Sequence, residues 1–488
     1  MDIIINLDKV VALFSMPADV LLAKFFLYVG WLPLAGIILW GILQIWLNYI
    51  IGDYVSKWEF VLLAIDVPPG NEQTPKAIEQ LFAHLAGAHT SVNLVDKYWV
   101  GKKQHVFSFE IISIGGYTQF IIRTNKATRN LVEAMIYAQY PDAEITEVED
   151  YVSKVPDRFP DDNYDIMGAE WVPAQNEMYP IKLYTEFEDK NTGDFKDPMA
   201  ALMEMYGGLR KGEQCWYQII IVPTNFEWEK RGPEEISKII GEKVEGKKNM
   251  ADKIIDPLIS AISSISDFLI PLGDVSDKKE NELDTFKMFN LKPAEKKRMD
   301  AVQLKVSKIG FECKIRFIYV AEKEVMDRNR FSSFVGVMKQ YSAEDVNSLK
   351  PDMETTATST SYIMKASRLN ERKNRLMAGY KARSDWLGKD RYILNIEELA
   401  TLWHFPLEEA VKAPMLQKVA SRKGAAPSYL PVEGTTSDFG NELKLFSQSP
   451  KQSSDSERDE IFAPAKSATS LNNRGAIKKS GPPANLPV

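Results

Sequence analysis

The stretch that decides the fold is residues 58–87, WEFVLLAIDVPPGNEQTPKAIEQLFAHLAG, where a strand pattern changes to a helix pattern. Its first part, Glu59–Val67, is a continuous apolar run ended by prolines, which is typical of a buried strand. Thr74 and Pro75 then stand as an N-cap and a first helical residue, and apolar residues recur at helical spacing until Gly87. These residues predict the first β-α step of an α+β fold.

The residues that follow extend this step into the order β-α-β-β-α-β. The pattern predicts a strand over His105–Ser113, a glycine turn and a returning strand over Gln119–Arg123. A helix over residues 131–136 and a strand over Ala143–Tyr151 come next. Because this order is the ferredoxin-like one, we interpret residues 58–152 as a ferredoxin-like α+β unit.

A similar order recurs in residues 180–322, which we interpret as a second unit of the same type, interrupted by a charged helical insertion at 226–288. The predicted elements are a strand over Ile181–Phe187, a helix that opens at Asp197, a strand over Trp216–Val222, a helix over Glu295–Ile309 and a strand over 313–319. The fold class predicted for the body is therefore α+β, with tandem ferredoxin-like units.

Residues 254–272 of the insertion have apolar residues at amphipathic spacing. Three interpretations stay open: a helix packed on its own domain, which is favoured, a helix that binds a partner, and a helix on a membrane surface. Asp256 and Asp267, with few basic residues nearby, argue against anionic lipid.

The C-terminal part divides in two. Residues 331–431 are predicted to be a helical extension, in which Asn395 and Glu398 have the spacing of a capping box. Residues 432–488 are rich in small and polar residues and cannot bury enough apolar surface to offset their ordering entropy, so a disordered tail is expected.

The composition excludes several classes of protein. With 45% hydrophobic and 26% charged residues over 488 positions, the chain is neither polytopic in a membrane nor wholly disordered. A net charge of −7 disfavours a general nucleic-acid coat protein, which needs a basic surface. Two cysteines exclude a disulfide scaffold and a four-cysteine zinc site.

Residues 25–51, FFLYVGWLPLAGIILWGILQIWLNYII, contain no charged residue and are long enough to cross a bilayer core of ~30 Å. The run is longer than the apolar part of a signal peptide, and a core helix is rarely apolar on every face. We therefore predict a single transmembrane helix, preceded by a juxtamembrane segment at residues 1–24. The aromatic residues expected at the two membrane interfaces are Tyr28, Trp31, Trp46 and Tyr49.

Motifs for catalysis are weak. Residues 241–248, GEKVEGKK, resemble a phosphate loop but have Lys248 where the motif needs a hydroxyl for magnesium. None of the four histidines has a partner at metal-ligand spacing. We therefore predict a protein that is not an enzyme, with no catalytic residue, no metal, no cofactor and no evident small-molecule substrate, although scattered carboxylates leave an unrecognised enzyme as an alternative.

One basic cluster, residues 365–391, contains nine basic and three acidic residues, a local net charge of +6. Tyr380 and Trp386 lie among the charges, which is compatible with stacking on nucleic-acid bases, and anionic lipid headgroups are another candidate ligand. The alternative is a solvated helix face that pairs with acidic residues elsewhere. The candidate contact residues are Arg368, Arg372, Lys373, Arg375, Lys381 and Arg383.

Several segments together resemble the N-terminal, non-catalytic half of membrane-associated bacterial type IV secretion or conjugative DNA-transfer ATPases. They are residues 58–87, SFEII at 108–112, LVEAMIYAQYPDAEI at 131–145, RYILNIEELATLWHFP at 391–406 and APMLQKVASRKGAAPSYLP at 413–431. In that family the last segment leads into a motor domain with a phosphate loop, whereas here it leads into the tail, so ATP hydrolysis is not implied.

The resemblance implies a component of a type IV secretion- or conjugation-like machine in the bacterial inner membrane. Its large region is expected in the cytoplasm, as a scaffold or docking module for a separate motor ATPase or other subunits. The lysines flanking the apolar run count little toward orientation, because large domains follow the charge rule poorly. A membrane-tethered nucleic-acid-binding module is the alternative function.

Overall fold

The computed structural model describes residues 17, 19–20, 31–68, 71, 73–189, 195–240 and 291–407. Most of the juxtamembrane segment, the amphipathic stretch at 254–272, the sequence that resembles a phosphate loop, and the tail at 432–488 lie outside these residues.

The body is built on one antiparallel sheet of nine strands, in the order β4-β1-β3-β2-β6-β7-β5-β8, with β9 paired to β7. The α+β prediction is therefore confirmed. The strands are β1 (Phe60–Asp66), β2 (Phe107–Ile114), β3 (Tyr117–Asn125), β4 (Glu144–Val148), β5 (Tyr164–Pro173), β6 (Glu213–Pro223), β7 (Gly310–Glu322), β8 (Leu349–Pro351) and β9 (Tyr392–Asn395).

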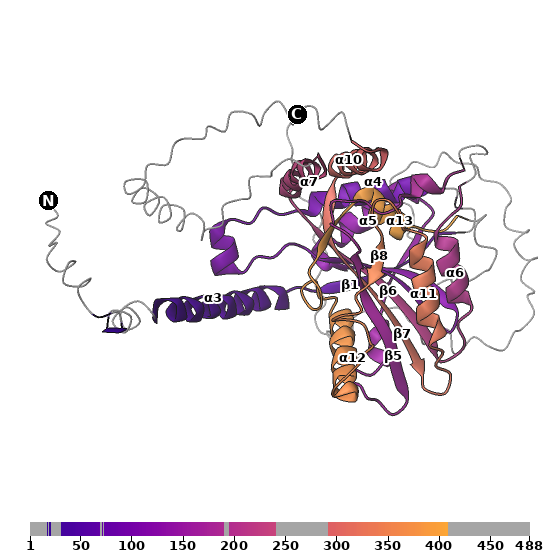
Figure 1. The fold of residues 1–488 in the computed structure, drawn as a ribbon. Helices are drawn as coiled ribbons and strands as arrows, with labels where there is room; N and C mark the ends of the chain where they lie inside the picture. The colour runs from indigo at the N-terminus through magenta and orange to yellow at the C-terminus, as the bar shows by residue number, and fades with distance from the viewer. Residues whose placement is uncertain are drawn as a thin grey trace, which may run out of the picture.

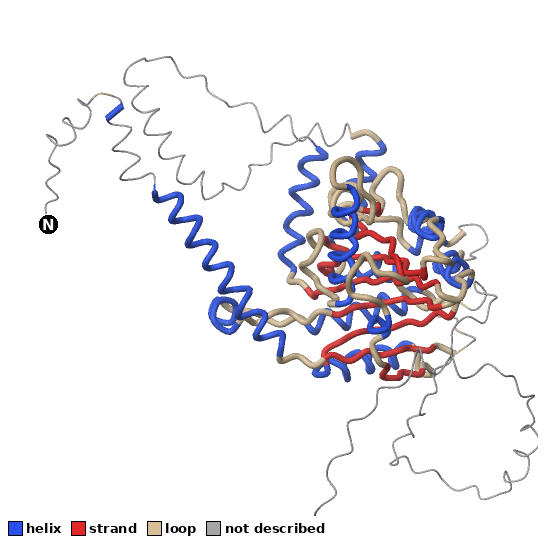
Figure 2. Tube along the Cα trace, turned by 90° about the horizontal axis from the view of Figure 1, so that it is seen from below, coloured by secondary structure: helices blue, strands red, loops and turns tan. Residues whose placement is uncertain are grey.

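The sheet has two halves with the same chain order. In the first half β1, α4 (Pro75–Leu85), β2, β3, α5 (Arg129–Gln139) and β4 follow one another along the chain. In the second half β5, α6 (Met199–Gly207), β6, β7, α11 (Asn329–Lys339) and β8 have the same order, with further helices inserted between β6 and β7. The halves join along β2 and β6, which pair from Phe107 opposite Ile221 to Ile114 opposite Gln214. This joint makes the two halves one continuous sheet (Figure 2).

Five helices cover one face of the sheet and bury the main apolar core. Each presents an apolar stripe at helical spacing, as Ile78, Leu81, Phe82 and Leu85 do in α4. At the centre, Trp403 meets the rings of Phe109 and Phe120 edge-on. The helices are α4 (Pro75–Leu85), α5 (Arg129–Gln139), α6 (Met199–Gly207), α11 (Asn329–Lys339) and α13 (Ile396–Leu402).

The opposite face is covered by α12 (Lys365–Lys381) and by the segment around η4 (Tyr151–Lys154). Leu376, Met377 and Tyr380 of α12 pack there on the alternate residues of the strands, such as Trp216 and Ile318. Figure 1 shows α12 lying beside β5, away from the five helices of the other face.

The second half begins earlier than predicted. Its first strand is β5, and the predicted strand over Ile181–Phe187 is wrong, because a 3-10 turn, η5 (Tyr184–Phe187), occupies its end. The backbone N–H groups of Ile181 and Tyr184 donate to side chains of α13, at 3.0 Å to Glu398 Oε1 and 2.8 Å to Thr401 Oγ1. Apolar residues in this segment are buried against α13. Their alternation with polar residues is the same pattern that a strand produces, which explains the wrong prediction.

Two other predictions need correction. The helix expected over Glu295–Ile309 is present as α10 (Pro293–Val306), but it is not one of the helices that complete the second half. It packs instead against α7 (Arg231–Ile240), which follows the short η6 (Phe226–Lys230). The extension predicted to be helical contains strands as well, because α11 and β8 complete the second half and β9 pairs with β7. The capping box at Asn395 and Glu398 is confirmed, with reciprocal bonds of 2.8 and 2.9 Å.

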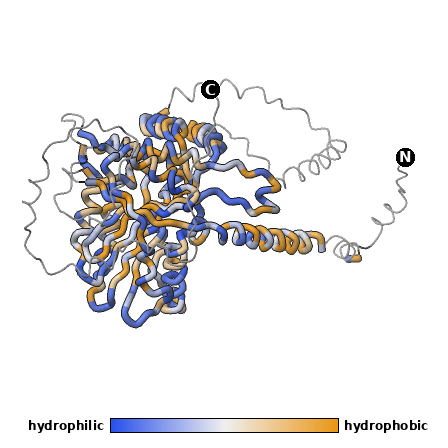
Figure 3. The backbone as a smooth tube through the Cα atoms, turned by 180° about the vertical axis from the view of Figure 1, so that it is seen from behind, coloured by the Kyte–Doolittle hydropathy of each residue, from blue (hydrophilic) through white to orange (hydrophobic). Residues whose placement is uncertain are grey.

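The helix α3 (Trp31–Ser56) extends away from the body and is apolar over most of its length (Figure 3). An 18-residue stretch within Leu34–Ser56 has a mean hydropathy of 1.8, and by length and composition this part of α3 could cross a membrane, as an anchor or as a signal sequence. Most side chains of α3 are exposed, for example Leu39 at 73%. Packing against the body therefore does not account for its apolar character.

Candidate functional site

The basic cluster lies on α12 and on the loop that joins α12 to β9. Sequence spacing places Leu376, Met377 and Tyr380 on one face of α12, and burial of that face against the sheet leaves the opposite face toward solvent. The helix ends at Lys381 with Ala382 as its C-cap, and Arg383 adopts the left-handed conformation with φ of +48°. This backbone conformation directs the Arg383 side chain toward Glu110 of β2.

Several cations of the cluster pair with carboxylates on other elements. Lys373 forms an ion pair with Asp165 of β5, and Lys381 contacts Asp157 at 2.6 Å. Beyond the helix, Arg391 bridges Asp385 at 2.5 Å and Glu312 of β7 at 2.9 Å. These ion pairs attach α12 and the loop that follows it to the rest of the body.

Arg383 is the most deeply buried of these cations. Its Nε atom donates to Glu110 Oε1 of β2 at 3.0 Å, and its Nη2 donates to Asp150 at 2.8 Å. Glu110 is fully buried at the centre of the sheet face and accepts further hydrogen bonds. The other donors to Glu110 are Ser108 Oγ at 2.7 Å, Tyr151 OH at 2.9 Å and Gln218 Nε2 at 3.0 Å.

The electrostatics of this pair favour its charged form. Burial alone would raise the pKa of Glu110, but the charge of Arg383 and the hydrogen bonds around the carboxylate outweigh it and lower that pKa. Burial likewise opposes the charge of Arg383, yet Glu110 and Asp150 raise its pKa well above the ordinary value. A buried ion pair with its hydrogen bonds satisfied therefore holds the end of α12.

A second buried pair supports the loop after α12. Arg316 of β7 donates through Nε to Glu170 of β5 at 2.8 Å, and its Nη2 donates to the carbonyls of Ser384 and Leu387 at 2.7 and 2.6 Å. Gly388 has φ of +98°, and a side chain there would meet the Glu170 carboxylate. The loop conformation is thus specified by Arg316, Glu170 and Gly388 together.

The cluster also has a solvent-facing part. Lys365, Arg368 and Arg375 are exposed on α12, and among the described residues Arg375 pairs with Glu371, which is also exposed, at 3.1 Å. Trp386 in the loop is 74% exposed. These four side chains form what we call the exposed basic face.

The remaining predicted contact residues lie elsewhere. Arg372 shares the helix face of Arg368 and Arg375, but its guanidinium donates to backbone carbonyls between residues 353 and 359, including that of Ser359 at 2.6 Å. Tyr380 is fully buried and its OH lies 2.8 Å from that of Tyr151, so it is not available to stack on a base. Lys373, Lys381 and Arg383 are held in the ion pairs described above.

Of the predicted interfacial residues, three lie on α3 and Tyr28 lies outside the described residues. Trp31 is exposed at the start of the helix, and Trp46 and Tyr49 are exposed further along. The Trp46 indole N–H donates to the backbone carbonyl of Tyr98 at 3.0 Å. A segment of the body therefore touches the apolar helix, which sequence patterns did not reveal.

The histidines and cysteines have structural surroundings. His404 Nε2 lies 3.0 Å from Asp197 in the core, and the His105 ring stacks on Trp58 at 5.3 Å. Cys215 and Cys313 are fully buried, and burial raises the pKa of both thiols. Within the described residues no group of three or more histidines, cysteines and carboxylates has the arrangement of a metal site.

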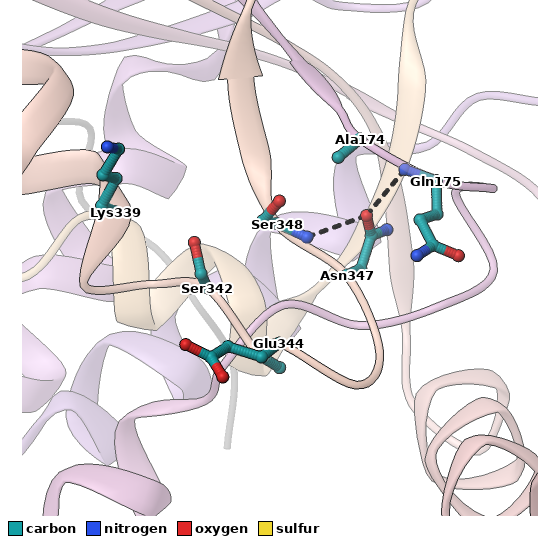
Figure 4. A pocket seen from close by; sticks show the side chains of 8 residues that line it. Ala174, Gln175, Lys339, Ser342, Glu344, Asn347 and Ser348 are labelled. Atoms are coloured by element: carbon teal, nitrogen blue, oxygen red, sulfur yellow. Dashed lines mark hydrogen bonds between the residues drawn. The ribbon is translucent and has the colours of Figure 1, made fainter. Parts of the chain in front are cut away.

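A pocket of about 390 Å³ lies between the end of β5 and the turn before β8 (Figure 4). Asn347 stands in its wall, where its Oδ1 accepts from the N–H groups of Gln175 at 3.0 Å and Ser348 at 2.9 Å. Its Nδ2 donates to the carbonyls of Asn176 and Tyr179. Asn347 therefore joins two loops and has no free donor or acceptor for a ligand.

These features define an α+β protein in which one antiparallel sheet carries a long apolar helix and a partly buried basic cluster. The chain belongs to the family described as domain of unknown function DUF8128, whose model matches residues 63–417. The matched region covers the whole sheet from within β1 onward and leaves α3 outside. No curated protein matches the chain.

Proposed function

We propose that this chain is a single-pass protein of the bacterial inner membrane whose cytoplasmic α+β body serves as a scaffold or docking module. Its partners would be a separate motor ATPase or other subunits of a type IV secretion- or conjugation-like machine, and the chain itself would carry out no catalysis. The observation that carries this proposal is the direct connection between α3 and the sheet.

Only residues 57–59 separate the end of α3 at Ser56 from the start of β1 at Phe60. Trp58 in this link is held by Tyr54, Phe60 and His105, with ring centroids 5.7, 6.0 and 5.3 Å away. A short link packed on both sides transmits the orientation of the helix to the body. A body held in one orientation at a membrane is suited to dock a partner that must itself be aligned with that membrane.

The strand orders support the interpretation of the body as two ferredoxin-like units. β4-β1-β3-β2 in one half and β6-β7-β5-β8 in the other are the same order read from opposite edges, and each has the chain order β-α-β-β-α-β. We propose that each half is a ferredoxin-like unit and that the body is a tandem pair. Four of the five segments of the resemblance fall on β1, α4, β2, α5, β9 and α13, and the fifth, residues 413–431, lies outside the described residues.

The proposal is tested by capturing partners from native membranes. The tagged full chain is cross-linked in the cells of its source, solubilised and purified beside an unrelated single-pass protein that carries the same tag. We expect enrichment of a motor ATPase or secretion subunit with this chain alone. If neither is enriched, or if the purified chain hydrolyses ATP above background, the proposal is wrong.

A membrane-tethered nucleic-acid-binding module is the second candidate, and the exposed basic face favours it. Lys365, Arg368 and Arg375 are exposed on one helix, and the ring of Trp386 is exposed in the loop that follows it. Cations that track a phosphate backbone next to an aromatic platform are typical of proteins that bind single strands.

We expect that replacing Arg368 and Arg375 with glutamate weakens binding of a fluorescent DNA oligonucleotide to the full chain. The slope of log affinity against log salt should fall by roughly 1 for each lost phosphate contact. Arg372 is left unchanged because it holds the adjacent loop. The measurement is fluorescence polarisation at several salt concentrations.

A matched control makes the same charge change elsewhere. Lys126 and Lys297 are 65% and 61% exposed in their side chains, and each forms a surface ion pair within the described part of the chain. Their double glutamate variant should retain more of the affinity than the Arg368 and Arg375 variant. Absence of binding at low salt, or an equal loss in both variants, would contradict the second candidate.

A further inference from the structure

The segment of residues 91–101 projects from the body alongside α3 (Figures 1 and 3). It contains η2 (Asp96–Val100), a single π-helical turn, between the end of α4 and β2. Unusually for a segment between two core elements, its large apolar side chains face solvent. They are Leu94, Val95, Trp99 and Val100, with exposed fractions of 75%, 66%, 76% and 48%.

Hydrogen bonds within the segment fix the conformation in which these apolar side chains are exposed. The backbone N–H of Asp96 donates to Asn93 Oδ1 at 2.7 Å, and that of Lys102 donates to the carbonyl of Asp96 at 2.9 Å. Asp96 also pairs with Lys102 at 3.9 Å. These bonds close the turn at both ends, so its apolar side chains are held outward.

The same segment packs directly on α3. Trp46 donates to the carbonyl of Tyr98, and the rings of Trp46 and Trp99 lie 6.4 Å apart, edge to face. Gly101 has φ of +72°, and a Cβ there would lie 2.5 Å from the backbone of Ile50. Glycine thus permits the segment to approach α3 closely.

This contact places the exposed residues relative to a bilayer. Asp53 and Lys57 pair at 2.8 Å near the end of α3, and charged groups are costly in hydrocarbon, so the apolar layer ends before them. Trp46 and Tyr49 then lie at the depth where aromatic side chains are enriched. Trp99, which contacts Trp46, lies at that depth too. Within residues 91–101 the charges of Asp96 and Lys97 sum to zero. The segment would therefore contact a bilayer mainly through its apolar side chains.

We propose that residues 91–101 form a second membrane-contacting element, in which Leu94, Val95, Trp99 and Val100 enter the interfacial layer of the bilayer that α3 crosses. The inference rests on the proposed role of α3 as an anchor. Two attachment points, a helix and a turn beside it, define a tilt of the body that one helix alone would leave free. The ligand of this surface is the lipid bilayer itself.

The test uses the full chain in phosphatidylcholine nanodiscs, labelled with a nitroxide at Trp99→Cys and, separately, at Leu94→Cys. The buried Cys215 and Cys313 should take no label, which the unmodified chain checks. A label at Leu39→Cys reports on α3, and one at Tyr362→Cys, a position 90% exposed, reports on water. Electron paramagnetic resonance then compares collisions with oxygen, which partitions into lipid, and with a water-soluble nickel complex.

We expect the oxygen-to-nickel collision ratio at positions 94 and 99 to shift from the value at 362 toward that at 39. If 94 and 99 match 362 while 39 reports lipid, the inference is wrong and the anchor stands. If 39 also reports water, the anchor itself fails, and the inference fails with it. Spin–spin broadening at 99 would mean that a second copy of the chain covers the turn, which also contradicts the inference. The second label position keeps the test valid if one variant misfolds.

Discussion

Replacing Leu39 and Leu43 of α3 with arginine is expected to release the chain from the membrane. Both side chains are exposed on the part of α3 that lies beyond the body, at 73% and 41%, so the substitutions leave the sheet intact. An arginine near the centre of a spanning helix costs about 2.5–3.5 kcal/mol of insertion free energy, so two cost roughly 6 kcal/mol. That is large enough to move most of the chain from the carbonate-resistant membrane fraction to the supernatant.

The matched control is the double variant Leu39→Ala with Leu43→Ala, which keeps α3 uncharged and helical. It should stay in the membrane fraction. Circular dichroism of both variants in detergent should show the same content of sheet and helix. Retention of the double arginine variant in carbonate-washed membranes would show that α3 is not the membrane anchor.

Replacing Arg383 with methionine is expected to lower the free energy of unfolding of the body by about 3–5 kcal/mol, because it leaves a buried carboxylate without its counter-charge. Glu110 is fully buried, and Arg383 supplies two of its hydrogen bonds, at 3.0 and 3.3 Å. Asp150 loses its partner as well. Urea unfolding of the full chain in detergent, followed by tryptophan fluorescence, measures the loss.

The control is Arg375→Met on α12, the helix that precedes Arg383. Arg375 and Glu371 are 60% and 69% exposed in their side chains, so their ion pair contributes at most about 1 kcal/mol. Adding Glu110→Gln to Arg383→Met should recover part of the loss, since an amide remains hydrogen-bonded without a buried charge. A loss in Arg383→Met no larger than that in Arg375→Met would contradict the assigned role of the pair.

The candidate site was only partly predictable. The basic cluster is visible in the sequence because like charges within 27 residues stand out, but its division into a structural and an exposed part is not. Arg383 and Arg375 are the same residue type in the same segment, and only the left-handed turn at Arg383 brings its side chain to Glu110, 273 residues away in the chain. The turn at residues 91–101 was missed because its apolar residues have no regular period.

Local patterns in the sequence determined what depends on neighbours along the chain. These are the apolar helix α3, whose run of uncharged residues needs no partner, the periodic helices α4 and α5, and the capping box at Asn395, where three-residue spacing is itself the geometry. They also determined the strands of the first half, through the continuous apolar run of β1 and the two-residue glycine turn that joins β2 to β3.

Tertiary structure decided everything that depends on distant pairing. The strand β5, with polar residues and Gly168 in its sequence, is a strand because β7 supplies its hydrogen bonds and Phe317 leaves no room for a side chain at Gly168. Ile181–Phe187 is not a strand because α13 satisfies its backbone instead. A sequence pattern reports whether a residue is buried, but the identity of the element that buries it depends on contacts made after the chain has folded.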